Sequence, residues 1–203
     1  MFAKTRYLPM AIEKLTTLRR ITIRTAYHIA VRPIKKADVD GLVQLHMEFE
    51  KYLKAIDNSR PRLARNTYRE RLINDGFGKT RAFSGLIACR DGTPIGYVFY
   101  HHGYDPDEMR GRVLYVIDLY VTEKERNLGI GRLLMDSVAS VCMGTCGIDI
   151  YFGVWAKNKP AQAFYKTLGA TKVHDVPFMH WKRNQWPQWK DAVVNGSAAK
   201  GTT

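Results

Sequence analysis

The chain has 203 residues, of which 45% are hydrophobic and 25% charged, which is typical of a soluble globular protein of one domain. No apolar run approaches the roughly 20 residues that span a bilayer, so we expect no membrane partner. The net charge is +13, but much of it lies in the two terminal segments. Residues 1–27 carry six Lys or Arg and one Glu, and residues 182–203 carry four and one Asp, which leaves +5 between them. We therefore expect no nucleic-acid partner.

The three cysteines, Cys89, Cys142 and Cys146, are odd in number, and two of them lie one helical turn apart. This pattern indicates reduced, buried thiols and a cytoplasmic protein. No Cys/His cluster has the spacing of a zinc site, so we predict no metal.

Three regions follow from the composition. Residues 1–27 form a basic extension with leucines near helical spacing, which is compatible with an extra helix, a targeting segment or an over-extended start. Residues 28–183 form the folded domain. Residues 184–203 have a composition that need not fold, so we expect a disordered tail.

In chain order, a strand is predicted at 28–32, followed by an amphipathic helix whose apolar stripe runs from Val39 to Leu53. A second helix is expected at 61–73, ended by Asn74-Asp75-Gly76. Strands at 83–89 and 95–101 flank a short polar turn and predict a β-hairpin.

The second half alternates strands and helices. Strands are predicted at 113–121 and 148–155, helices at 132–142 and 160–168, and a final hairpin from Val173 to Trp181. This order predicts an α/β (α+β) fold, with a central mixed, mostly antiparallel sheet flanked by helices.

The segment from Arg126 to Gly131 is a Gly-rich turn between the strand at 113–121 and the next helix. Such a turn exposes backbone N–H groups at a helix start, which suits a pyrophosphate. The turn has no Lys-Ser/Thr pair, which excludes a P-loop. Leu134 stands where the dinucleotide fingerprint requires its third glycine.

The turn fits Arg/Gln-x-x-Gly-x-Gly/Ala, the acetyl-CoA motif of the GNAT acetyltransferases. Asn158 to Ala170 resembles a second segment of that family, Asn-x-x-Ala-x-x-Phe-Tyr-x-x-x-Gly-Phe/Ala. The element order is also the GNAT order, and the resemblance covers roughly residues 28–181.

Within that superfamily the chain is similar to the spermidine/spermine and thialysine acetyltransferase branch. The matching residues are Asp75-Gly76-Phe77-Gly78, Tyr104-Asp105-Pro106, and Leu114-Tyr115 with Asp118. The chain departs from the branch at Ile117, where the branch has a glutamate that handles the substrate amine. The departure puts polyamine specificity in doubt.

The resemblance implies acetyl-CoA as co-substrate, with the turn holding the pyrophosphate and one strand pairing with the pantetheine arm. Asn158 would bind that arm, although it is also a natural N-cap for the helix that follows. The implied cofactor-binding residues are Leu119, Tyr120, Val121, Arg126, Asn127, Leu128, Gly129, Ile130, Gly131, Arg132, Asn158, Ala161 and Phe164.

The chemistry needs a group that protonates the leaving thiolate and a group that docks the amine. Tyr165 is the expected general acid, because a phenol keeps its proton at pH 7. By resemblance, Asp105 and Asp118 dock the amine, although strand alternation places Asp118 and Leu119 on opposite faces unless a bulge intervenes. His101 and His102 are further candidate bases, whereas Glu48 and Glu50 are expected at a solvated helix face or its edge.

The sequence thus predicts an N-acetyltransferase that moves an acetyl group from acetyl-CoA to a primary amine of a small molecule by direct attack. A polyamine or an amino-acid-like amine is favoured. A protein or peptide acceptor, an aminoglycoside acceptor, a non-catalytic acyl-CoA-binding regulatory domain and a nucleic-acid module remain alternatives. Relatives often form homodimers, so a homodimer is also expected.

Overall fold

The computed structural model describes residues 20–21, 28–58, 63–105 and 110–173. The chain divides into two units, residues 1–168 and 169–203. All the helices and strands among the described residues belong to the first unit. They are β1 (Arg20–Ile21), β2 (Ile29–Pro33), the 3-10 turn η2 (Lys36–Asp38), α1 (Val39–Ile56), α2 (Arg65–Phe77), β3 (Ser84–Arg90), β4 (Thr93–Tyr104), β5 (Arg112–Val121), the 3-10 turn η3 (Glu123–Glu125), α3 (Ile130–Gly144), β6 (Gly147–Phe152) and α4 (Lys159–Thr167).

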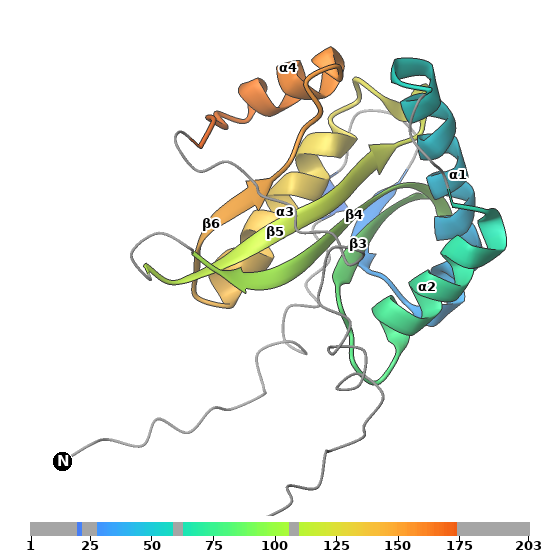
Figure 1. Cartoon of the computed structure of the whole chain (residues 1–203), viewed down its shortest axis with the longest axis horizontal. Helices are drawn as coiled ribbons and strands as arrows, with labels where there is room; N and C mark the ends of the chain where they lie inside the picture. The colour runs from blue at the N-terminus through green and yellow to red at the C-terminus, as the bar shows by residue number, and fades with distance from the viewer. Residues whose placement is uncertain (1–19, 22–27, 59–62, 106–109, 174–203) are drawn as a thin grey trace, which may run out of the picture. The chain divides into compact units, whose positions relative to one another are not determined.

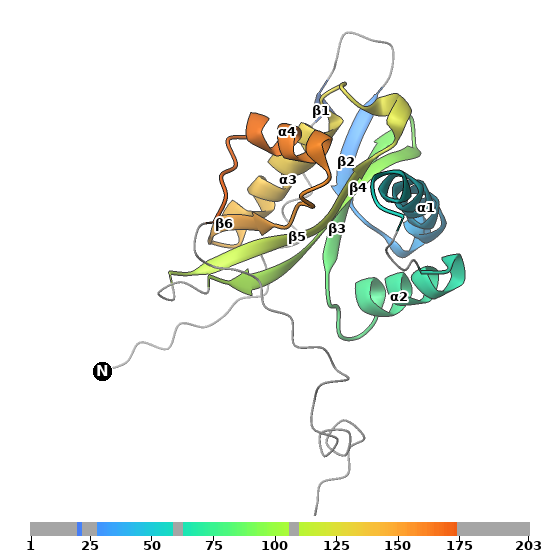
Figure 2. The same cartoon turned by 45° about the horizontal axis from the view of Figure 1, so that its top comes forward.

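The strands form one sheet in the order β1-β2-β3-β4-β5-β6, in which only β5 and β6 are parallel (Figure 1). Helices α1 and α2 cover one face, and α3 and α4 lie on the other side (Figure 2). Each face has its own apolar core. Leu42 of α1 and Leu72 of α2 are buried in one core, and Leu134 and Val138 of α3 in the other. The predicted mixed, mostly antiparallel sheet flanked by helices is confirmed.

The predicted hairpin of β3 and β4 is confirmed, and its turn residues explain it. Asp91 and Gly92 both have positive φ, at 47° and 84°. Two consecutive residues of that kind form the turn whose twist matches an antiparallel ribbon.

A β-bulge interrupts the pairing of β4 with β5 at Ile117. Tyr100 pairs with Val116 and Phe99 pairs with Asp118, so Ile117 has no partner across the ladder. The extra residue reverses the alternation of side chains along β5. As a result, Val116 packs in the core under α3, while Asp118 shares a face with Phe99 of the core under α1 and α2.

The parallel pairing of β5 with β6 stops early. The last register partners are Val116 and Phe152, although β5 continues to Val121. From Ile117 onward, no strand among the described residues therefore lies beside the edge of β5 that faces β6. This separation opens the sheet at the carboxyl ends of these two parallel strands, a place where ligands of α/β proteins bind.

Some predicted boundaries are wrong. The strand predicted at 148–155 ends at Phe152, where β5 and β6 separate. The Asn74-Asp75-Gly76 sequence does not end α2, which continues to Phe77 and is followed by the C-cap Gly78. Gly76 instead permits close packing, because a Cβ there would lie 3.1 Å from the ring of Phe83. The expectation of buried thiols also holds only for Cys89 and Cys142, since Cys146 is exposed.

Several predictions fall outside the described residues. They concern most of the 1–27 extension, the start of the second helix at Pro61, the hairpin strand at 178–181 and the tail at 184–203. Within the described part of the chain, no helix is long and apolar enough to cross a membrane.

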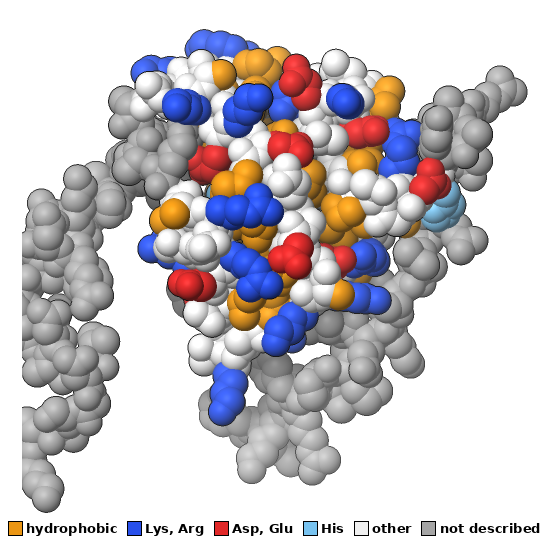
Figure 3. Space-filling model, turned by 90° about the vertical axis from the view of Figure 1, so that its right-hand side faces the viewer, with side chains coloured by type: hydrophobic (Ala, Val, Ile, Leu, Met, Phe, Trp, Pro, Cys, Tyr) orange, Lys and Arg blue, Asp and Glu red, His pale blue; other side chains and the backbone are white. Residues whose placement is uncertain are grey.

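The face that carries α1 and α2 has a mixed surface. Basic and acidic side chains alternate over it (Figure 3), and Arg69 of α2 forms an ion pair of 3.2 Å with Asp40 of α1. On this face the positive charge does not gather into the stripe that is typical of a nucleic-acid interface.

The core position of α3 can be tested with Leu134→Ala. Leu134 is fully buried, so we expect the free energy of unfolding to fall by about 2–5 kcal/mol, measured by urea denaturation. Met143→Ala, on the same helix but 70% exposed, is the control and should cost less than about 0.5 kcal/mol. Equal losses in the two variants would contradict this orientation of α3.

Candidate active site

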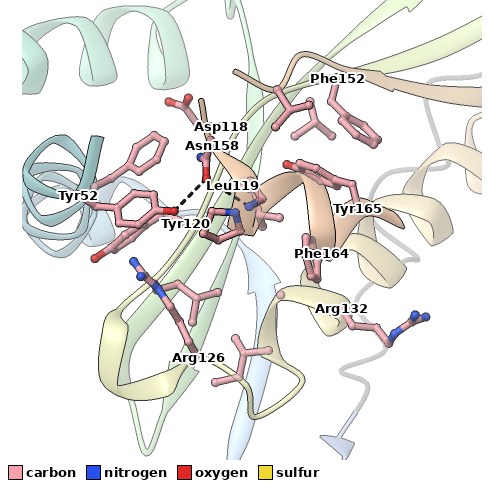
Figure 4. A pocket seen from close by; sticks show the side chains of 18 of the residues that line it. Tyr52, Asp118, Leu119, Tyr120, Arg126, Arg132, Phe152, Asn158, Phe164 and Tyr165 are labelled. Atoms are coloured by element: carbon pink, nitrogen blue, oxygen red, sulfur yellow. Dashed lines mark hydrogen bonds between the residues drawn. The ribbon is translucent and has the colours of Figure 1, made fainter. Parts of the chain in front are cut away.

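A pocket of about 500 Å³ lies where β5 and β6 separate. Its walls come from α1, the end of β5, the turn that follows, the start of α3, the segment after β6, and α4 (Figure 4). All but two of the predicted site residues line it. They are Asp118, Leu119, Tyr120, Val121, Arg126, Asn127, Gly129, Ile130, Gly131, Arg132, Asn158, Ala161, Phe164 and Tyr165.

The turn before α3 presents backbone N–H groups to this pocket. Gly129 has φ = 79°, in the left-handed region, and nothing lies where its Cβ would be. The backbone conformation, and not a lack of space, therefore favours glycine at this position. The first helical hydrogen bond joins the Leu133 N–H to the Gly129 carbonyl. The amides of Ile130, Gly131 and Arg132 precede that bond and form the donor-rich end of the helix.

The last residue of the turn, Gly131, is small for a packing reason. A Cβ on Gly131 would lie 3.3 Å from the ring of Phe164, so a side chain there would push α4 away from the start of α3. The two helices approach closely enough to close the pocket on this side. Amide donors, glycines and a helix start are a donor set that fits the pyrophosphate of acetyl-CoA.

Two arginines flank the turn with different contacts. The Arg126 Nε donates to the Val121 carbonyl at 3.0 Å, and its guanidinium lies 4.5 Å from the ring centre of Tyr52. Arg132 donates to the Thr167 carbonyl at 2.6 Å and points away from the centre of the pocket (Figure 4). Arg126 is thus the one of the two whose side chain is held against the pocket wall.

Asn158 is buried and caps α4, as its position in the sequence suggested. Its Oδ1 accepts the Ala161 N–H at 3.2 Å and the Tyr52 hydroxyl at 2.9 Å. Tyr52 was not predicted as a site residue. Its signal was its place three residues after Phe49 on α1, because residues at that spacing share one side of a helix.

Tyr165 lies on α4 with its ring stacked on Phe152, 4.1 Å between centres. Burial, together with the charge of Asp118, raises the pKa of Tyr165 to about 12. The phenol therefore keeps its proton across the physiological range, as a general acid must.

Asp118 reaches the same pocket from the opposite face of the sheet, the face under α1. Burial, and next the charge of Glu50, raise the pKa of Asp118 to about 6. A carboxyl group with that pKa is mostly ionised at pH 7 and can still accept a proton near neutrality.

The two α1 glutamates lie at the edge of that helix and are half-buried rather than fully solvated. Glu48 accepts the Thr122 hydroxyl at 2.9 Å, which ties α1 to the end of β5. Glu50 lies 3.6 Å from the His46 Nε2. Burial lowers the pKa of His46 to about 4, so this imidazole is neutral at pH 7.

The structure does not bring the remaining predicted residues into the pocket. Asp105 is fully buried, where it accepts hydrogen bonds from Arg110 at 2.9 Å and Tyr151 at 3.0 Å. Leu128 is 48% exposed and is not part of the pocket wall. His101 stacks on Tyr115, 5.1 Å between centres, and neither it nor His102 lines the pocket. Among the described residues, no cluster of His, Cys, Asp or Glu could hold a metal ion.

Residues 46–170 match the acetyltransferase (GNAT) family. The chain belongs to this family. It is an acetyl-CoA-dependent N-acetyltransferase, and the predicted resemblance is confirmed. Its cytoplasmic location and its homodimeric state stay predictions.

Two curated relatives belong to the branch that the sequence suggested. The chain is 29% identical over 160 residues to thialysine N-epsilon-acetyltransferase of Bos taurus, covering 75% of this chain and 89% of the relative. It is 30% identical over 116 residues to the Homo sapiens spermidine/spermine N(1)-acetyltransferase-like protein 1, covering 54% of this chain and 16% of that protein.

A solved structure, an integron cassette protein from V. cholerae, has the same fold. It superposes with a TM-score of 0.66 at 18% identity, covering 83% of this chain and 98% of that one. At that identity the likeness supports the fold alone.

The environment of Asp118 in this acetyltransferase predicts a pH-dependent stability. Its pKa is 3.8 ordinarily and about 6 when folded. Between those values the folded protein binds more protons than the unfolded chain, so this group makes stability fall as pH rises from about 4 to 6. Asp118→Asn removes this effect. The free energy of unfolding of the variant minus that of wild type should therefore be about 2 kcal/mol larger at pH 7 than at pH 4.

Urea denaturation at the two pH values measures this difference. Asp136→Asn, at an exposed position of α3, is the control and should show no such change. If Asp118→Asn differed from wild type equally at both pH values, the burial of the carboxylate would be contradicted.

Proposed function

We propose that this acetyltransferase acetylates a primary amine of a small molecule, a polyamine or an amino-acid-like amine, by direct attack on the acetyl thioester. One observation carries the proposal. Asp118 and Tyr165 face one pocket from opposite faces of the sheet, at the place where β5 and β6 separate. A proton acceptor and a proton donor thus lie on the two sides of the gap in which the acetyl group would be held.

On the cofactor side, acetyl-CoA would supply the acetyl thioester. The amides of Ile130, Gly131 and Arg132 would hold its pyrophosphate, and Asn158 its pantetheine arm. The edge of β5 from Ile117 to Val121, beside which no described strand lies, has backbone groups that can pair with that arm as an added strand. One of these N–H groups would polarise the thioester carbonyl.

On the acceptor side, the ionised Asp118 would dock the ammonium group and accept a proton from it. Glu50, whose charge acts on Asp118, adds negative potential on this side, where the branch's glutamate is replaced by Ile117. Ile117 itself is 49% exposed and lines the pocket, so it offers an apolar contact to an alkyl amine. The names of the relatives, a thialysine acetyltransferase and a spermidine/spermine acetyltransferase-like protein, support an acceptor of this class.

The proton balance gives each residue one task. The amine nitrogen forms a bond to the carbonyl carbon and the C–S bond breaks. The ammonium nitrogen loses two protons. The first leaves through Asp118 to solvent. Tyr165 gives its proton to the thiolate, and the second proton from the nitrogen restores the phenol. Holding both partners in line supplies much of the rate enhancement.

The first experiment offers purified protein acetyl-CoA with polyamines, amino acids, aminoglycosides and short peptides, and follows free thiol. Release that depends on a polyamine or an amino-acid side-chain amine supports the proposal. Release with peptide N-termini alone would favour the peptide acetyltransferase instead. Binding of acetyl-CoA without release by any amine would favour the regulatory domain.

Tyr165→Phe tests the general acid. Removing the phenolic proton should lower kcat with the best amine by about 10²-fold or more, with little change in the KM for acetyl-CoA, because the ring packing on Phe152 is kept. Tyr151→Phe, which loses a hydroxyl outside the pocket, should keep wild-type kcat. A Tyr165→Phe variant with undiminished kcat would remove this residue from the proposal.

The pH dependence of the reaction tests Asp118. Because its carboxylate must be ionised and its pKa is about 6, kcat/KM for the amine should rise as pH increases through 6. This limb should be absent from the profile of Asp118→Asn, while Tyr165, with its pKa of about 12, adds no limb between pH 5 and 9. An unchanged acidic limb in Asp118→Asn would assign it to another group.

A further inference from the structure

Tyr52 is a pocket residue to which the proposed chemistry gives no task. It lies near the end of α1, and its hydroxyl donates to the Asn158 Oδ1 at 2.9 Å. The two residues are 106 positions apart in the chain. The bond joins the helix on the acceptor side of the sheet to the start of α4 on the cofactor side, across the pocket (Figure 4).

Two bonds hold the Asn158 side chain. Its Oδ1 accepts two donors, the Tyr52 hydroxyl at 2.9 Å and the Ala161 N–H at 3.2 Å. A flipped amide would place its NH₂ group against the Ala161 N–H and lose that bond, so the peptide donor sets which way the amide faces, and the Tyr52 hydroxyl holds the oriented side chain from the other side of the pocket. The Nδ2 group makes no hydrogen bond to another described residue, and Asn158 lines the pocket. The side chain therefore keeps two N–H donors for a ligand.

Tyr52 is itself held by the phosphate-binding turn. The guanidinium of Arg126 packs on the Tyr52 ring at 4.5 Å and lies 5.6 Å from the ring of Tyr120. The same side chain donates to the Val121 carbonyl at 3.0 Å. Arg126, Tyr52 and Asn158 thus form a continuous line of contacts from the turn to α4 around the pocket.

A second contact between the same elements is weaker. Lys157 precedes Asn158 in the chain, and its Nζ lies 3.1 Å from the Asp57 Oδ2, but the lysine side chain is 68% exposed. An exposed ion pair of this kind contributes little. The Tyr52 hydroxyl is therefore the stronger of these two contacts between α1 and the start of α4.

We propose that Tyr52 is a positioning residue for acetyl-CoA, which holds the Asn158 side chain in place for the pantetheine arm and links the phosphate-binding turn to α4. The inference rests on the proposed function for the contact of Asn158 with that arm. It adds a residue of α1, on the acceptor side, to the binding of the cofactor. The acceptor helix is thereby coupled to an occupied cofactor site.

The test is a double-mutant cycle that measures the Kd of acetyl-CoA by calorimetry, with no amine present. Tyr52→Phe removes only the hydroxyl. Loss of one oriented hydrogen bond should raise the Kd about 3- to 10-fold. Asn158→Ala should raise it as well. In the Asn158→Ala background, Tyr52→Phe should have almost no further effect, because its partner is gone.

Two controls separate positioning from a general structural role. Tyr151→Phe also removes a tyrosine hydroxyl that donates to a side chain, the carboxylate of Asp105 at 3.0 Å, but outside the pocket, and it should keep the wild-type Kd. In steady-state kinetics, Tyr52→Phe should raise the KM for acetyl-CoA by a similar factor while the KM for the amine stays unchanged.

A wild-type Kd for Tyr52→Phe would overturn the inference, as would an effect that adds fully to that of Asn158→Ala. Wild-type protein that binds acetyl-CoA but acetylates no amine would overturn the proposed function alone. The binding cycle would still decide the role of Tyr52 in that case.

Discussion

The end of pairing between β5 and β6 is the constraint on which the rest of the site depends. Two parallel strands that stay together join their backbone groups by hydrogen bonds, whereas strands that separate leave N–H and C=O groups that need other partners. Here the last paired residues of β5 and β6 are Val116 and Phe152, and among the described strands only β4 accompanies β5 as far as Val121. The gap is thus a place where an extended, amide-containing arm can complete the sheet, and it opens beside the donor-rich start of α3.

The bulge at Ile117 decides what faces that gap. Without the extra residue, Asp118 would lie on the same face as Val116, among the apolar side chains under α3. With it, Asp118 faces the α1 side while Leu119 and Val121 keep to the cofactor side. In the proposed function, one strand thereby supplies both the backbone edge for the cofactor and the carboxylate for the amine. Burial of that carboxylate raises its pKa toward neutrality, which a proton acceptor at pH 7 requires.

The walls of the pocket are joined mainly by polar contacts of α1. Glu48 binds Thr122 after β5, and Tyr52 binds Asn158 before α4. These bonds span the opening that the separated strands leave, so the helix on the acceptor side also braces the cofactor side. The packing of Arg126 on Tyr52 brings the turn before α3 into the same set of contacts.

The sequence by itself determined the element order, the turn from Arg126 to Gly131 and the cap at Asn158, because these depend on local periodicity, glycine and short-range hydrogen bonds. Its resemblance to a family motif supplied the acid candidate Tyr165. The predicted end of α2 was wrong, because Gly76 allows close packing against Phe83 and does not end the helix. The sequence also selected Asp105, which folding buries with Arg110 and Tyr151. Only the tertiary structure decided the bulge, the raised pKa of Asp118 and the contact of Tyr52 with Asn158. Strand register, desolvation and a bond between residues 106 positions apart arise when distant segments meet, and no local pattern encodes them.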